Sequence, residues 1–169
     1  MNDANIVNVF DEYCKDKKIK SIVSYADRNA LILENDSPND NHIKAFIDFS
    51  YIPKEGINQN FVMVLLQYLP HQDWSGLFTN NYTLKFKYKF SSNIKGLQLE
   101  IKNSDMEKIV DEFIPNKAEG EFSLEISKIG VVDLWKDIKE LCFTVFHGND
   151  YINGDKGTIE IYDFVLMKK

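Results

Sequence analysis

Apolar and polar residues alternate along several short stretches of this chain, most regularly in YTLKFKYKF. One face of that stretch carries only apolar side chains, those of Leu84, Phe86, Tyr88 and Phe90. The other face carries lysines, at positions 85, 87 and 89. A period of two residues is that of a β-strand with one face in the core and the other in water. We therefore predict a strand here whose apolar face points inward.

The same period, or a short unbroken apolar run, recurs along the chain and predicts about nine strands in all. The other stretches are SIVSY, ALILE, IKAFIDFSYI, NFVMVLLQYL, LQLEIK, FSLEIS, LCFTVF and TIEIYDFVLM. NFVMVLLQYL is apolar almost throughout, which is typical of a strand in the middle of a packed sheet. Many short strands joined by polar loops predict an all-β sandwich or barrel.

The first eighteen residues follow a different pattern. Apolar side chains recur there at helical spacing, at Ile6, Val7, Phe10 and Tyr13. The polar run CKDKK follows them and ends the pattern. We therefore predict a helical lead-in over residues 1–18 and one β-sandwich domain over residues 19–169.

Composition and charge narrow the class of protein. A chain of 169 residues with 44% apolar and 13% aromatic residues can bury a sizeable core in one domain. Its net charge of −6 argues against general binding to nucleic acid or to an anionic membrane. Cys14 and Cys142 form no CxxC motif, so neither a disulfide framework nor a zinc site is expected.

Targeting signals do not settle the location of the protein. The start, MNDANIVNVFDEYCKDKK, lacks the basic and apolar regions of a signal peptide, and no stretch is apolar enough to span a membrane. The sequence fits a cytoplasmic protein as given, and an extracellular one if it is cut from a larger secreted protein.

Enzyme signatures are absent from the sequence. There is no GxSxG, P-loop, HExxH or GxGxxG motif. A histidine-based metal cluster would need His42, His71 and His147 to converge. Two carboxylates on one face can hydrolyse a glycoside, but nothing marks such a pair among 26 acidic residues. We therefore predict that the chain is not an enzyme, with an uncommon hydrolase as the remote alternative.

Three segments follow one another in a characteristic order. A tryptophan segment with Trp74 precedes the strand from Leu84 to Phe90. Ile138 to Phe143 lead into the penultimate strand, and the last strand ends at Ile161 to Leu166 with the pattern I-x-D-F/I-x-L. Together these segments, over roughly residues 42–167, resemble the galactose-binding-like jelly-roll domains, many of which are carbohydrate-binding modules attached to glycoside hydrolases. The resemblance implies a β-sandwich jelly roll of two antiparallel sheets with a lectin-like function.

Asp163 is an unusual residue of the closing strand. Alternation places it on the apolar face with the two isoleucines before it. A buried carboxylate needs a partner. The resemblance implies a structural Ca²⁺ ion that joins Asp163 to an oxygen near the start of the sandwich, from Asp27, Glu34 or Asp48. The alternative is that Asp163 caps a turn or pairs with a lysine at a strand edge.

Aromatic and polar residues gather in the segment YLPHQDWSGLF. We predict Tyr68, His71 and Trp74 as ligand-binding residues, because an aromatic ring can stack on a sugar while polar neighbours bond its hydroxyls. The alternative is that Trp74 fills one end of the sandwich core and Trp135 the other end.

Two further places hold candidate binding residues. Lys87, within the row of lysines, can face an acidic glycan, or else simply belong to a solvated sheet face. The loop HGNDYINGDKG carries four more candidates, His147, Asn149, Asp150 and Tyr151, at the rim of the sandwich. The alternative is that this loop only connects two strands and binds nothing. Its Asn153-Gly154 pair is typical of a hairpin turn.

These observations favour a non-catalytic carbohydrate-binding module whose partner is an oligo- or polysaccharide, bound by a concave sheet face and its rim loops. The alternative is a protein–protein interaction or structural module of a larger assembly, with a protein partner or an attached enzyme domain. An exposed row of aromatic side chains would favour the first function. A broad, flat apolar patch would favour the second.

Overall fold

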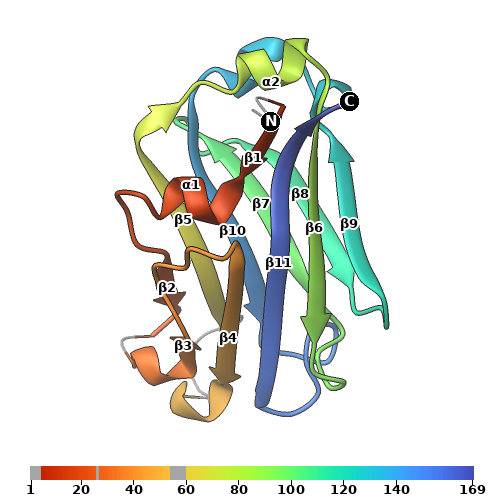
Figure 1. The fold of residues 1–169 in the computed structure, drawn as a ribbon. Coiled ribbons are helices and arrows are strands. Elements are labelled where there is room, and N and C mark those ends of the chain that lie inside the picture. Colours follow the sequence, from red (N-terminus) through yellow and green to blue (C-terminus); the bar gives the residue numbers. More distant parts are fainter. Residues whose placement is uncertain (1–4, 26, 54–59) are drawn as a thin grey trace.

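The computed structural model describes residues 5–25, 27–53 and 60–169. Two antiparallel β-sheets pack face to face, with short helical segments at the ends of the strands (Figure 1). The prediction of an all-β sandwich of two antiparallel sheets is therefore confirmed.

Six strands form one sheet and five form the other. The six-stranded sheet has the order β3 (Leu31–Leu33), β4 (His42–Asp48), β11 (Lys156–Lys168), β6 (Tyr82–Phe90) and β9 (Gly120–Glu125), with β1 (Ile6–Asn8) also paired to β11. The five-stranded sheet has the order β2 (Lys20–Val23), β5 (Phe61–Gln72), β10 (Ile138–Phe146), β7 (Gly96–Asn103) and β8 (Lys108–Pro115).

The helical segments are all short. They are α1 (Val9–Tyr13), α2 (Ser75–Thr79) and the 3₁₀ turns η1 (Arg28–Ala30), η2 (Phe49–Tyr51), η3 (Ile126–Lys128) and η4 (Val132–Trp135). Within the described ranges, no helix has the length and apolar character to cross a membrane.

All nine predicted strands are present, and the sequence missed β1 and β8. The three residues of β1 lie inside a segment with helical spacing. In β8, KIVDEFIP, the adjacent charges of Asp111 and Glu112 interrupt the alternation. Both missed strands are held by pairing with a longer neighbour, β1 by β11 and β8 by β7.

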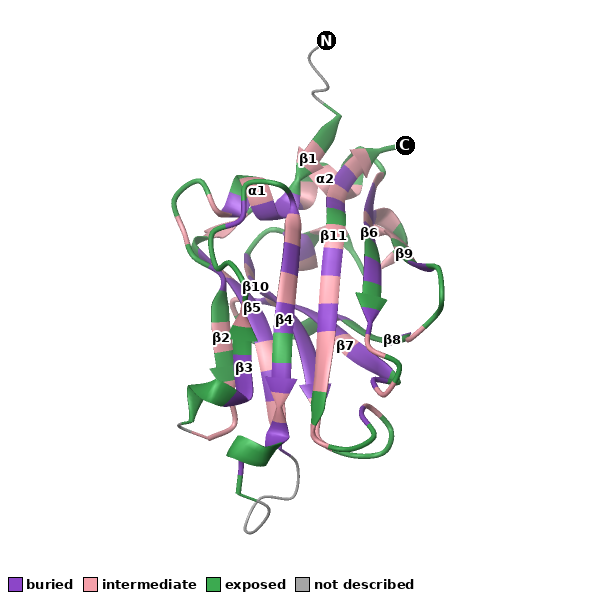
Figure 2. Cartoon of the chain, turned by 60° about the horizontal axis from the view of Figure 1, so that its bottom comes forward, coloured by how far each residue is buried: buried purple, intermediate pink, exposed green. Residues whose placement is uncertain are grey.

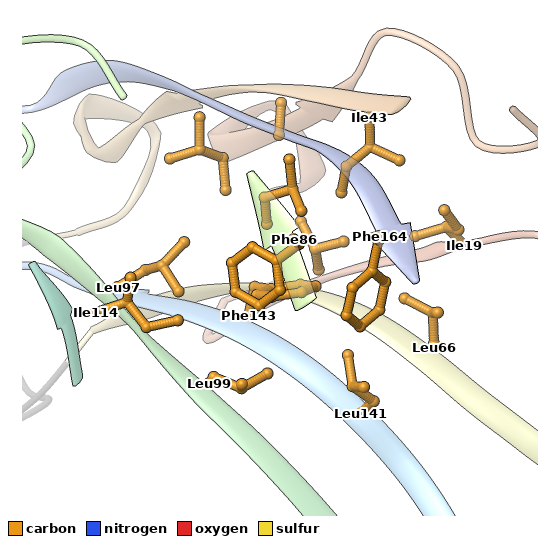
Figure 3. Packing of buried hydrophobic residues seen from close by; sticks show 14 of the residues in the cluster. Ile19, Ile43, Leu66, Phe86, Leu97, Leu99, Ile114, Leu141, Phe143 and Phe164 are labelled. Atoms are coloured by element: carbon orange, nitrogen blue, oxygen red, sulfur yellow. The ribbon is translucent and has the colours of Figure 1, made fainter. Parts of the chain in front are cut away.

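The core lies between the two sheets. The apolar face of β6 points into it as predicted, and burial alternates along the strands (Figure 2). Phe86, Phe143 and Phe164, from three strands, meet in the core with ring centroids 5.3 to 6.0 Å apart (Figure 3). All three contacts are edge-on, an arrangement that stabilises beyond the area that the rings bury.

The N-terminal segment is part of the sandwich. The helix is present but has only five residues. Its side chains Val9, Phe10 and Tyr13 are buried in the core, and β1 before it extends the six-stranded sheet. Val9, Phe10 and Tyr13 therefore tie this segment to the core of the sandwich.

The hairpin predicted at Asn153-Gly154 is wrong. β10 and β11 belong to different sheets, so the loop between them crosses from one sheet to the other. Gly154 does adopt a left-handed conformation, with φ of 78°. The turn is thus real, but it is local and joins no hairpin.

Candidate functional site

Tyr68 and Trp74, two predicted ligand-binding residues, lie in the core. They are only 8% and 7% exposed. The Trp74 ring lies parallel to that of Trp135 at 6.3 Å and edge-on to Tyr68 at 5.8 Å. Trp74 and Trp135 are thus at the same end of the sandwich, not at opposite ends. Because so little of either side chain is exposed, neither ring offers an open face for a sugar to stack on, which favours the core alternative for Trp74.

A cavity of about 830 Å³ does adjoin these two aromatic rings, between the N-terminal segment and the start of α2. Its walls carry the carboxylates of Asp11, Glu12, Asp16 and Asp73. Lys15 and Lys17 line it as well, so with the rings nearly covered this cavity offers charged groups of both signs but no open aromatic platform.

The other predicted polar residues are scattered. His71 Nδ1 lies 2.9 Å from Asp137 Oδ1, at the same end as Trp74. Lys87 lies on the outer face of the six-stranded sheet, where its Nζ is 3.4 Å from Asp163 Oδ2. The three histidines each contact a different carboxylate, of Glu160, Asp137 and Asp155, and do not converge.

Asp163 does not face the core, so the prediction from alternation is wrong. The register of β11 against β6 shifts between Tyr162 and Val165, which marks a β-bulge. Asp163 occupies it with φ of 50°, and its N–H donates to the carbonyl of Asn41. Its side chain is 62% exposed. The extra residue shifts the alternation, so that Phe164 is the residue that points into the core.

Asp163 and Asp27 cannot share one calcium ion. Asp27 caps η1, which leads into β3, and Leu31 of β3 pairs with Ile47. Asp163 binds Asn41, which precedes the other end of β4. About six residues of strand separate the two places, or about 20 Å, whereas calcium ligands lie within about 2.6 Å of the ion. A Ca²⁺ ion at Asp163 therefore stays a prediction that needs other ligands.

The outer face of the five-stranded sheet carries apolar residues that the sequence did not single out. Leu65 and Cys142 pair across β5 and β10. Both are buried, at 7% and 0% exposed, yet neither belongs to the core between the sheets. Side chains on the outer face must therefore cover them.

Four aromatic side chains form a row across one end of this face. We call Phe61, Phe146, Tyr151 and Phe113 the aromatic row. Successive ring centroids lie 6.2, 5.1 and 5.3 Å apart, and Phe113 is 44% exposed. Gly96 makes room for the last ring, since a Cβ there would lie 2.5 Å from Phe113 Cζ. The row joins β5, β10, the loop after β10, and β8.

A polar network begins at the aromatic row. The Tyr151 hydroxyl donates to Gln98 Oε1 at 3.1 Å, and the Gln98 amide donates to Asp111. Lys108 lies within 4.0 Å of Asp111 and 3.4 Å of Glu100. Burial raises the pKa of the Tyr151 phenol, and the charge of Asp111 adds to this shift. Tyr151 therefore stays a neutral hydroxyl at physiological pH.

The network continues into the middle of the sheet. Lys102 Nζ lies 3.3 Å from both Glu100 Oε2 and Glu140 Oε1. Burial alone would lower the pKa of Lys102, but the neighbouring negative charges outweigh it and raise that pKa. The ammonium group occupies the space between the two carboxylates. A glycosidase would need this space for its substrate, so the pair does not support the hydrolase alternative.

The predicted rim loop lies beside this face. Tyr151 is a member of the aromatic row, and the exposed residues Asn149 and Asp150 precede it. The His147 ring stacks on Phe49 at 4.6 Å, and its Nε2 lies 3.0 Å from Asp155 Oδ1.

Sequence reasoning missed the other members of the row and the network. Phe61 lies in a strand that is apolar on both faces, so alternation did not reveal its direction. Phe113 lies in the unrecognised strand β8. The one available signal was Glu100 and Lys102, which alternate with apolar residues in LQLEIK and so face outward.

No protein-family model matches the sequence, and a search of curated proteins finds no match. Solved structures do share its fold. An agarase matches with a TM-score of 0.62 and 11% identity, over 98% of this chain and 25% of the agarase. A family 30 carbohydrate-binding module matches with a TM-score of 0.54 and 10% identity, over 92% of this chain and 85% of the module.

A family 11 carbohydrate-binding module from Clostridium thermocellum also matches, with a TM-score of 0.50 and 10% identity, over 90% of this chain and 89% of the module. The chain spans about a quarter of the length of the two agarases that it resembles. At these identities the likeness shows the fold. The resemblance to the jelly roll of carbohydrate-binding modules is therefore confirmed.

Proposed function

We propose that this chain is a non-catalytic carbohydrate-binding module that holds its glycan against the outer face of the five-stranded sheet. The aromatic row carries this proposal. Four rings, each about 5 to 6 Å from the next, present apolar surface, at least that of Phe113, to solvent. Sugar rings have apolar faces that pack on such side chains.

The polar network supplies the second requirement of a sugar site. Tyr151, Gln98 and Asp111 are linked by hydrogen bonds, so their donors and acceptors are held in place before a ligand arrives. Preorganised groups lose less entropy on binding, which matters for sugars because water competes for the same hydroxyls.

The fold neighbours support the same function. Several are named as carbohydrate-binding modules, and one structure of the family 11 module, with a TM-score of 0.51, contains a β-1,3-1,4-mixed-linked tetrasaccharide. Two others are agarases in which the matched part is about a quarter of the chain. We further propose that this module works together with an attached enzyme domain.

A glycan array tests the function, and it should include mixed-linkage β-glucan and agarose oligosaccharides. Titration calorimetry then measures the affinity for each hit. We expect Phe113→Ala to weaken binding about fivefold, because a stacking contact contributes about 1 kcal/mol. Its melting midpoint should hardly change, because the side chain is exposed. Tyr151→Phe keeps the ring and removes the hydrogen bond to Gln98, so it separates stacking from hydroxyl recognition.

Val131→Ala is the matched control, since Val131 is 61% exposed and adjoins η4, at the end of the sandwich that holds Trp74. If Phe113→Ala and Tyr151→Ala bind as tightly as the unmodified chain, the aromatic row is not the site. If the array shows no glycan at all, the carbohydrate function is wrong and the protein-interaction alternative replaces it.

A further inference from the structure

The opposite surface of the sandwich holds a second hollow. A depression of about 450 Å³ lies over β3, β4 and β11 on the outer face of the six-stranded sheet. Three of its large side chains, Ile32, Phe46 and Tyr51, are 50%, 42% and 46% exposed. Figure 2 is turned toward this part of the sheet and shows an exposed stretch within β4. We call this place the β4 hollow.

Phe46 breaks the pattern of its own strand. The outward positions of β4 are His42, Lys44, Phe46 and Asp48. Phe46 is thus an aromatic residue among three polar ones. Ile32 and Thr158 pair with Phe46 from the two neighbouring strands. Lys44 Nζ lies 5.4 Å from the centre of the Phe46 ring. Phe46 is thus the centre of a small apolar platform with a cation beside it.

Polar groups surround the platform. Asp48 accepts hydrogen bonds from Ser50, which lower the pKa of its carboxyl group and keep it an acceptor. The Asn93 amide is fixed because it donates to the backbone carbonyls of Asn153, in the loop before β11, and of Lys156, the first residue of β11. The amide of Asn29 and the hydroxyl of Thr158 also line the hollow.

The size of the β4 hollow decides what it can hold. Small-ligand sites are about 300–1,000 Å³, and 450 Å³ lies within that range. A stable protein interface buries about 800 Å² on each partner, far more than three exposed apolar side chains provide. An aromatic ring, an aliphatic neighbour and a rim of amide, hydroxyl and carboxylate groups suit a ligand with apolar faces and many hydroxyls.

We propose that the β4 hollow is a second carbohydrate site, which takes a short stretch of a sugar chain against Phe46 and Tyr51. It does not depend on the aromatic row, because the two places lie on the outer faces of different sheets. With both sites occupied, one molecule joins two separate glycan chains. Such a protein cross-links a polysaccharide, which a module with one site cannot do.

Nuclear magnetic resonance titration of ¹⁵N-labelled protein tests the two sites separately. The probes are the β-1,3-1,4-linked tetrasaccharide and an agarose-derived tetrasaccharide, each to about millimolar concentration because a shallow site binds weakly. We expect shift changes at the backbone amides of Phe46 and Thr158 as well as around Tyr151. Phe46→Ala should reduce the first set at least fivefold and leave the second set unchanged. Lys89→Ala, on the same sheet but outside the hollow, should alter neither.

Each outcome decides one of the two proposals. Changes only around the aromatic row overturn the second site and leave the proposed function intact. Changes only in the β4 hollow support the second site and overturn the aromatic row as the binding face. No change with either probe overturns both. Changes at both places that respond separately to Phe46→Ala and Phe113→Ala support both.

Discussion

A single residue can be central to the fold or to recognition, and its exposure separates the two roles. Trp74 and Phe113 are both aromatic and both come from segments with polar neighbours. Trp74 is 7% exposed and lies parallel to Trp135, whereas Phe113 is 44% exposed and ends a row of rings. Their substitutions should therefore have opposite consequences.

Trp74→Ala should lower the free energy of unfolding by about 3–5 kcal/mol, because it empties a large, well-packed part of the core. Glycan affinity of the remaining folded protein should be unchanged. Urea denaturation and calorimetry measure the two quantities on the same sample. Trp74→Phe, which keeps a ring, serves as the milder control. Lost binding with unchanged stability would place Trp74 in the sugar site after all.

The backbone conformation at position 163 explains why an aspartate is found there. At φ of 50° a residue with a Cβ is strained, by about 1 kcal/mol, and aspartate tolerates this better than most. We expect Asp163→Ala to cost about 1 kcal/mol of stability and Asp163→Gly to stay within about 0.5 kcal/mol of the parent. The exposed ion pair with Lys87 adds little.

The same pair of variants tests the calcium prediction. Melting curves are recorded in calcium and in a chelator. If Asp163 binds Ca²⁺, both variants lose a stabilisation that only the parent shows in calcium. If the bulge alone explains Asp163, calcium and chelator give the same midpoint for all three proteins. The first result would show that Asp163 binds Ca²⁺ together with ligands other than Asp27.

At the scale of elements, the aromatic row depends on how β7 and β8 pair. Gly96 of β7 is opposite Pro115, and its missing side chain leaves space for Phe113. An added methyl group would also press on the backbone carbonyl of Ile114. The position of the exposed ring is therefore set by a glycine on the neighbouring strand.

Gly96→Ala should lower the free energy of unfolding by about 1–3 kcal/mol, as overpacking usually does. It should also weaken glycan binding about as much as Phe113→Ala, because the ring must move. Gly76→Ala is the control, since nothing lies within 4 Å of the Cβ added there. Unchanged binding by folded Gly96→Ala would show that the ring position does not matter for recognition.

Elements also show why the fold was predictable and most of the site was not. The alternation in β6 is unambiguous because one of its faces is apolar and the other carries lysines. Alternation assumes an unbroken strand, so the bulge at Asp163 reversed the expected direction without a local warning. The aromatic row joins residues 61, 113, 146 and 151, which only strand pairing brings together. No local pattern encodes that pairing.

For the whole molecule, the two free cysteines make the free energy of unfolding depend on pH in the alkaline range. Burial, helped by the charge of Glu100, raises the pKa of the Cys142 thiol from its usual value near 9 to about 12. Burial likewise raises the pKa of Cys14 to about 11, with Asp11 adding to the shift. In the unfolded chain both thiols ionise at their usual pH. The unfolded state thus binds fewer protons between pH 9 and 12, so stability falls as pH rises through that window.

At pH 10 the Cys142 thiol would be ionised only in the unfolded chain. This alone should lower the free energy of unfolding by about 1.4 kcal/mol relative to pH 7. Urea unfolding at a series of pH values from 7 to 10.5 measures this slope. Cys142→Ala should show a shallower decline, whatever its absolute stability, because the buried tyrosines contribute equally to both proteins. Equal slopes for the parent and Cys142→Ala would mean that this thiol ionises as readily in the folded protein as in water. In that case the cluster of Glu100, Lys102 and Glu140 would not shield it, and the outer face of the five-stranded sheet would be more open to solvent than its packing indicates.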